Sequence, residues 1–242
     1  MHRLTGRTDA FLTAIRAELR GGHEIRAAAQ DAAGLAEAAR ELVPELRAAL
    51  GDPSLDRNIP RLDADTALAE ALWRVTGDAS EAVTVLGSVL ATADEPWHDW
   101  PVIRAARAAA RLGPSARPLR PLLEQMLGTS VTAPAAALAL LSAASAGQTF
   151  GGRDRGALAA LLLDSAERDE DAGTALEALT ALGAASLPDE AFRRLAALSE
   201  RDLRVVRSGL ESDIVRRDED LRARARATLA GLVAERGAAE SG

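Results

Sequence analysis

Histidine and cysteine, the side chains that most often bind metals or act as nucleophiles, are scarce in this sequence. Its 242 residues include three histidines and no cysteine, which excludes disulfides and thiolate chemistry. Among the histidines, His98 has acidic neighbours, at Asp94, Glu95 and Asp99. A zinc site needs about four ligands, commonly paired at helical or turn spacing, and one histidine beside surface acids does not supply them. The sequence therefore predicts no metal site.

Signatures of catalysis and of phosphate binding are also missing. We find no nucleophile-elbow or phosphate-loop pattern, and Gly151-Gly152 is too short to cradle a phosphate and indicates a turn. A serine, His98 and an aspartate can form a catalytic arrangement in any chain order, which geometry alone reveals. With that alternative left open, we expect a protein that is not an enzyme and has no cofactor, and we assign no catalytic residue.

Two of the three tryptophans lie in one predicted turn, 93–101, with the sequence ADEPWHDWP. The interpretation that we favour for Trp97 and Trp100 is a staple that packs over neighbouring helix ends and anchors a long turn. The alternative is a binding hot spot, because turns often carry binding residues and because Trp and Arg dominate hot spots. Any specific contact is then expected on this edge, at Trp97, His98, Trp100, Arg117 and Arg120.

Arginines also share one face of the helix that follows this turn, at Arg104, Arg107 and Arg111. Such a strip is able to bind an anion. We favour a solvated face instead, because all 29 basic residues of the chain are arginine and Arg is used freely at exposed helical positions. The preference for Arg over Lys indicates a GC-rich bacterial genome rather than a binding role.

The elements that position these residues follow an internal repeat. Leucines that end helices recur at steps of 40, 37, 36, 35 and 34 residues, at Leu50, Leu90, Leu127, Leu163, Leu198 and Leu232. This is the period of a two-helix repeat. The second helices are predicted at 41–50, 80–90, 118–127, 155–166, 189–198 and 218–234. First helices are predicted at 64–76, 102–112, 134–146 and 173–182.

Turn chemistry supports these bounds. Three of the first helices end at a glycine that suits a left-handed cap, at Gly77, Gly113 and Gly183. The capping-box spacing occurs twice near the starts of second helices, in Asp78 with Glu81 and in Ser186 with Asp189.

Leucines four residues apart stack on one face of a helix. The core is therefore expected to contain Leu86, Leu90, Leu123 and Leu127. Trp73, inside an apolar helix face, is expected to pack in the core as well. A second long turn, 51–62, carries Arg57 and Asn58 and is expected on the same edge as the tryptophans.

These features resemble the HEAT repeat family, in particular its short bacterial type. The nearest match is 105–127, which contains the Leu112-Gly113 turn and the Pro121-Leu122-Leu123 core of a second helix. The resemblance implies an all-α fold, an α-solenoid or superhelix of about six helix pairs. It also implies a scaffold more often than an enzyme, because such solenoids mostly bind other proteins.

The repeat register divides the chain. His2 to Gly6 matches Trp73 to Gly77 at an offset of 71 residues, so 1–22 is expected to be a partial repeat or a capping helix. The solenoid is expected over 23–235, followed by a disordered tail at 236–242. Because its preceding helix would be missing, we expect the first helix to leave an apolar edge open to self-association, at Phe11, Leu12, Ile15 and Leu19.

Composition limits the function classes. The formal charge of −7 makes nucleic acid and anionic membranes unlikely partners, because both attract basic surfaces. No run of about 18 apolar residues and no signal-peptide pattern occurs, so we expect a cytoplasmic protein.

Three hypotheses remain. The leading one is a protein- or peptide-binding scaffold with an unknown ligand. The second is a sensor or regulatory module cut from a longer chain. The third is an enzyme similar to the HEAT-like alkylpurine DNA glycosylases or phycobilin lyases, which the acidic charge and the scarcity of aromatic residues disfavour.

Overall fold

The computed structural model of the chain describes residues 2–53, 55–144, 150, 152–168, 171–200 and 211–241. In this part the protein is all-helical, with no strand and a single β-bridge between Phe150 and Arg153. The all-α class predicted from composition is therefore confirmed. Backbone contacts divide the chain into two compact units, Met1–Leu122 and Leu123–Gly242. Gly151 and the end of the predicted helix 134–146 lie outside the described residues.

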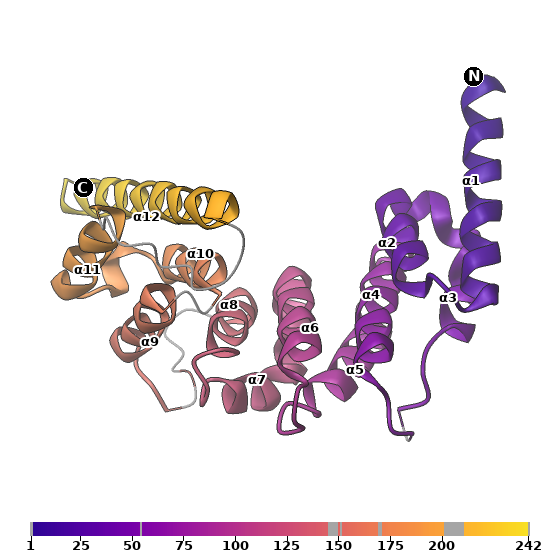
Figure 1. Cartoon of the computed structure of the whole chain (residues 1–242), viewed down its shortest axis with the longest axis horizontal. Helices are drawn as coiled ribbons and strands as arrows, with labels where there is room; N and C mark the ends of the chain where they lie inside the picture. Colours follow the sequence, from indigo (N-terminus) through magenta and orange to yellow (C-terminus); the bar gives the residue numbers. More distant parts are fainter. Residues whose placement is uncertain are drawn as a thin grey trace. The chain divides into compact units, whose positions relative to one another are not determined.

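The first unit is built from helices that alternate between two layers. Its elements are α1 (His2–Gly21), α2 (Ile25–Leu35), the 3-10 helix η1 (Ala36–Leu42), α3 (Val43–Ala48), α4 (Ile59–Thr76), α5 (Ser80–Leu90), α6 (Asp99–Leu112), η2 (Gly113–Leu119) and the start of α7 (Arg120–Met126). Helices α2, α4 and α6 pack side by side (Figure 1). The second layer contains η1 and α3, which pack on α4, α5, which packs on α4 and α6, and η2, which packs on α6. Each first helix therefore contacts the first helix of the next pair.

Local signals explain where these helices begin and end. Asn58 accepts a hydrogen bond from the Arg61 backbone amide at 3.0 Å and caps α4, whose first turn also holds Pro60. Gly77 ends α4 in the left-handed conformation, with φ of 77°. Gly113 and Gly183 also have positive φ, which favours glycine, but with ψ of −131° and 151° they do not form the predicted left-handed cap.

The predicted capping boxes form different contacts. Asp78 accepts from the Ser80 amide at 2.9 Å, and Glu81 pairs with Arg47. Ser186 accepts from Arg155 at 3.1 Å instead of capping the next helix. Glu81 and Ser186 thus bond to arginines of other helices, Arg47 of α3 and Arg155 of α9 (Arg155–Glu167), while Asp78 bonds to Ser80. The capping-box spacing therefore predicted the wrong partners.

The apolar face of α1 is covered within the chain. Leu12, Ile15 and Leu19 are buried in one cluster with residues of α2, η1, α3 and α4. Phe11 remains 42% exposed. The expected open edge is therefore wrong for three of its four residues, because 25–48 fold back over α1. The prediction of self-association depended on an exposed apolar edge, and three of the four residues of that edge are buried.

Arg57 is buried rather than presented on an edge. Its side chain is 8% exposed and donates to Asp65, whose side chain is 1% exposed, at 3.0 Å. Asp65 also accepts from Arg61 at 3.0 Å and from the Gly51 amide at 2.8 Å. Arg57 further donates to the Ser88 carbonyl of α5 at 2.9 Å. Gly51 and Arg57 of the predicted turn 51–62 thus connect the end of α3 with α4 and α5.

The second unit contains the rest of α7 and α8 (Ala133–Ala143), α9 (Arg155–Glu167), α10 (Ala172–Leu182), η3 (Ala184–Ser186), α11 (Asp189–Glu200) and α12 (Glu211–Glu240). Helix α10 packs against both α8 and α12, and α9 packs against α11 (Figure 1). The predicted second helix 218–234 is part of α12, and α12 packs on α10 as α10 packs on α8. The repeat register predicted 218–234 as a second helix, whereas α12 lies beside the first helix α10.

The end of the chain is helical where we expected disorder. Helix α12 continues to Glu240, so 236–240 are ordered. Arg236 donates to Asp189 and to the Leu187 carbonyl, both at 2.7 Å, and its guanidinium lies 3.9 Å from the centre of the Phe192 ring. Glu235 accepts from the Ala184 amide at 3.2 Å. These contacts hold the last turns of α12 against α11 and η3.

Candidate functional site

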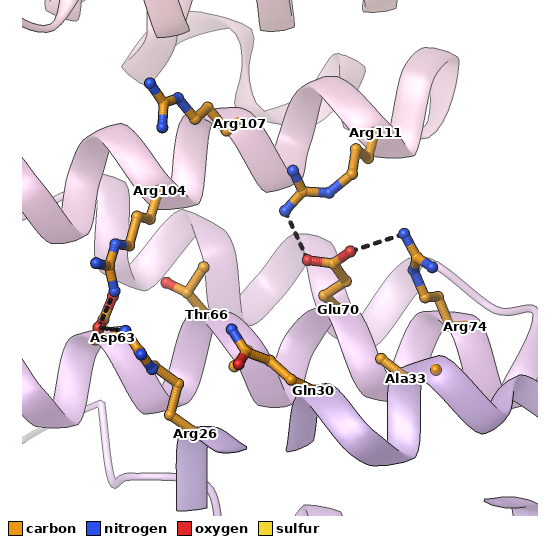
Figure 2. A pocket seen from close by; sticks show the side chains of 12 residues that line it. Arg26, Gln30, Ala33, Asp63, Thr66, Glu70, Arg74, Arg104, Arg107 and Arg111 are labelled. Carbon is orange, nitrogen blue, oxygen red and sulfur yellow. Dashed lines mark hydrogen bonds and ion pairs between the residues drawn. The ribbon is translucent and has the colours of Figure 1, made fainter. Parts of the chain in front are cut away.

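A groove lined by charged side chains runs along the first unit. It has a volume of about 490 Å³ and is formed by α2, α4 and α6 (Figure 2). Its charged lining residues are Arg26, Asp63, Glu70, Arg74, Arg104, Arg107 and Arg111. Five guanidinium groups minus two carboxylates give the lining a formal charge of +3, in a chain whose net charge is −7.

Matching stripes on the three helices build this groove. On α6 the arginines are spaced by three and four residues, which places them on one face. The opposite face of α6 is buried and rich in alanine, so α6 approaches its neighbours closely. Two ion pairs join α4 to α6 at the same sequence offset of 41, Asp63 with Arg104 and Glu70 with Arg111. The two helices therefore run in the same direction and in register.

The first charged cluster contains Asp63, Arg26 and Arg104. Arg26 of α2 donates to the Asp63 carboxylate of α4 at 3.2 Å, and Arg104 of α6 donates to the same oxygen. Both arginine side chains are half-exposed, whereas Asp63 is largely covered. One carboxylate thus links three helices and leaves one unbalanced positive charge.

The second cluster repeats the arrangement two turns further along. Glu70 of α4 accepts from Arg111 of α6 at 2.6 Å and from Arg74, one turn later on α4, at 3.0 Å. Again one carboxylate holds two half-exposed arginines. Between the clusters lie Gln30 and Thr66, with Arg107 between the other two arginines of α6 (Figure 2).

Only part of this site was visible in the sequence. The spacing of Arg104, Arg107 and Arg111 predicts a solvated face, whereas Arg104 and Arg111 form ion pairs with α4. Arg26, Arg74 and the two carboxylates were missed. A signal was present in the equal spacing of seven residues between Asp63 and Glu70 and between Arg104 and Arg111. It has meaning only once α4 and α6 are known to be neighbours.

The predicted tryptophan edge lies elsewhere in the first unit. Trp97 is 85% exposed and Trp100 is 66% exposed, so the favoured interpretation as a packed staple is wrong. Trp97 adopts a positive φ of 69° in the turn, and Trp100 stands in the first turn of α6 after the half-buried His98. Trp73, expected in the core, is only half-buried and lines a hollow beside α5.

The two arginines assigned to the same edge come from later elements. Arg117 is exposed in η2, and Arg120 opens α7 and is half-buried. The tryptophans flank the N-terminal end of α6, whereas these arginines follow its C-terminal end. A joint site of Trp97, His98, Trp100, Arg117 and Arg120 therefore stays a prediction.

Metal ligands and membrane-spanning helices are two further features by which a functional site is recognised. In the described part of the chain, no three His, Asp or Glu side chains gather as a metal site requires, and none of the described helices is long and apolar enough to cross a membrane. Comparison of the chain with protein-family models, with curated proteins and with solved structures gives no match.

Proposed function

We propose that this protein is a HEAT-like helical-repeat scaffold that binds a protein or peptide partner through the arginine-lined groove of its first unit. Stacking of α2 on α4 and of α4 on α6 supports the repeat assignment, because the joining ion pairs span 37 and 41 residues, close to the repeat length. In the second unit, α8, α10 and α12 stack similarly. The proposal includes an α-solenoid arrangement of the helix pairs and a cytoplasmic location.

The charge excess of the groove is the observation that carries the binding proposal. Half-exposed ion pairs contribute only about 0 to 1 kcal/mol each to folding. Gathering five arginines around two carboxylates therefore adds little stability, and the like charges repel one another. A bound anionic partner would compensate this repulsion, and Arg combines large contact area with directional polar contacts at hot spots.

The test compares partner capture by the groove with capture by the rest of the surface. The full chain and the double variant Arg104→Ala/Arg111→Ala are immobilised, and proteins retained from extracts of the source cell are identified and purified. The variant leaves Asp63 paired with Arg26 and Glu70 paired with Arg74, so its fold should persist, which circular dichroism checks. The matched control, Arg40→Ala/Arg193→Ala, removes two exposed arginines outside the groove.

We expect the groove variant to lose about 2 kcal/mol or more of binding free energy for the purified partner. The control variant should bind the partner as tightly as the parent does. Equal affinity of both variants for every retained protein would show that the groove is not the binding site.

A further inference from the structure

We infer that the ligand of the groove is an acidic protein segment that presents two carboxylates about 10 Å apart on one face, one for each arginine cluster. This inference rests on the proposed function and names its partner class.

The charge of each cluster points to a single carboxylate. In both clusters two guanidiniums share one carboxylate, Asp63 or Glu70, so these three side chains together carry one excess positive charge. Guanidinium has five N–H donors in a planar fork that matches a carboxylate. One further carboxylate per cluster would neutralise it and give each arginine pair a second acceptor.

The spacing of the clusters sets the spacing of the ligand. Asp63 and Glu70 are seven residues apart on α4, as are Arg104 and Arg111 on α6. At 1.5 Å per residue, seven residues of helix span about 10 Å. A helical segment with acidic residues seven positions apart presents both carboxylates on one face at this same interval. Gln30 and Thr66, between the clusters, are suited to polar contacts with the intervening residues.

Phosphate ligands fit less well. A phosphate monoester carries about −1.5 to −2 charges, which exceeds the single excess charge of a cluster and meets repulsion from the resident carboxylate. Charge balance therefore favours carboxylates.

The experiment titrates synthetic peptides into the full-length chain by isothermal titration calorimetry at low salt. The probe is a capped alanine- and glutamine-based helical peptide with two glutamates seven residues apart. One comparison peptide has the same composition with the glutamates two residues apart, which places them on different faces. The other has glutamine at both positions. We expect the probe to bind about tenfold more tightly than the peptide with glutamates two residues apart, which loses one charge-assisted contact. The difference should be larger for the glutamine peptide, which loses both contacts.

Variants of the protein show whether the peptide binds at the groove or elsewhere on the surface. Arg104→Ala/Arg111→Ala should weaken probe binding by about tenfold or more, and Arg40→Ala/Arg193→Ala should leave it unchanged. Asp63→Asn/Glu70→Gln removes the two competing carboxylates and raises the lining charge from +3 to +5, so it should bind the probe more tightly. A damaged fold would not produce that gain.

Three results would overturn the inference: equal binding of all three peptides, no gain in Asp63→Asn/Glu70→Gln, or tighter groove-dependent binding of inorganic phosphate or a short single-stranded oligonucleotide. If any of these occurs while a purified natural partner still requires Arg104 and Arg111, the ligand class is wrong and the proposed function stands. If the natural partner ignores both arginines, the proposed function falls independently of the peptide results.

Discussion

Removal of the Asp65 carboxylate should destabilise the first unit more than any loss of a surface ion pair. Asp65 is fully buried and receives three donors, from Arg57, Arg61 and the Gly51 amide. In Asp65→Ala, Arg57, whose side chain is 8% exposed, loses its carboxylate partner and keeps its hydrogen bonds to Ser88, and the Gly51 amide loses this acceptor. Breaking a buried pair by removing one partner costs about 3 to 5 kcal/mol. An amide left without an acceptor costs about 1 to 3 kcal/mol, and the two penalties overlap because they share one carboxylate.

Tryptophan fluorescence gives an assay that reports on the first unit alone, because all three tryptophans lie within Met1–Leu122. Trp73 is half-buried, so its emission should change on unfolding. Asp65→Ala should lower the free energy of unfolding, measured by urea titration at pH 7, by about 3 to 5 kcal/mol relative to the parent. The m-value should stay unchanged. Asp65→Asn should cost less, because the amide oxygen still accepts a hydrogen bond from Gly51.

The control is Glu81→Ala, which breaks the partly exposed pair with Arg47 and should cost about 0 to 1 kcal/mol. The double replacement Arg57→Met/Asp65→Leu should recover part of the loss, since no buried charge remains unpaired. A cost for Asp65→Ala no larger than that for Glu81→Ala would refute the view that this carboxylate ties α3, α4 and α5 together.

Two further predictions concern the turn before α6 and the contact between α1 and α3. Trp97→Gly should leave the urea midpoint unchanged or raise it, because Trp97 is exposed and glycine adopts φ of 69° without strain; a clear drop would mean that its side chain supports the fold. Burial of Glu45 raises its pKa, but hydrogen bonds from its own backbone and from Arg20, with the charges of Arg16 and Arg20, outweigh burial and hold the pKa below the ordinary 4.5. A lowered folded-state pKa gives stability that is present above 4.5 and lost as the pH falls through the folded value. Glu45→Gln should therefore be less stable than the parent at neutral pH and equal to it in acid, and a difference independent of pH would contradict this.

Local sequence determined the positions of most helices. The predicted helix 80–90 coincides with α5, and Leu86, Leu90, Leu123 and Leu127 are buried as expected. Stops at glycine were also correct. These features depend on a few neighbouring residues, since helical periodicity, capping and positive φ are all set within one or two turns. The same reasoning missed α2, whose buried residues are alanines that leave no leucine pattern.

Tertiary structure decided which side chains meet. The sequence showed the arginines of α6 but not Asp63 and Glu70 as their partners, because the pairs join residues 41 positions apart. It also could not show that Arg57 is buried against Asp65, that the tryptophans of the turn are exposed, or that α12 packs on α10. Each outcome depends on the register and layer in which one helix packs on another. The helical period fixes which face of a helix a residue occupies, and packing between helices fixes what that face contacts.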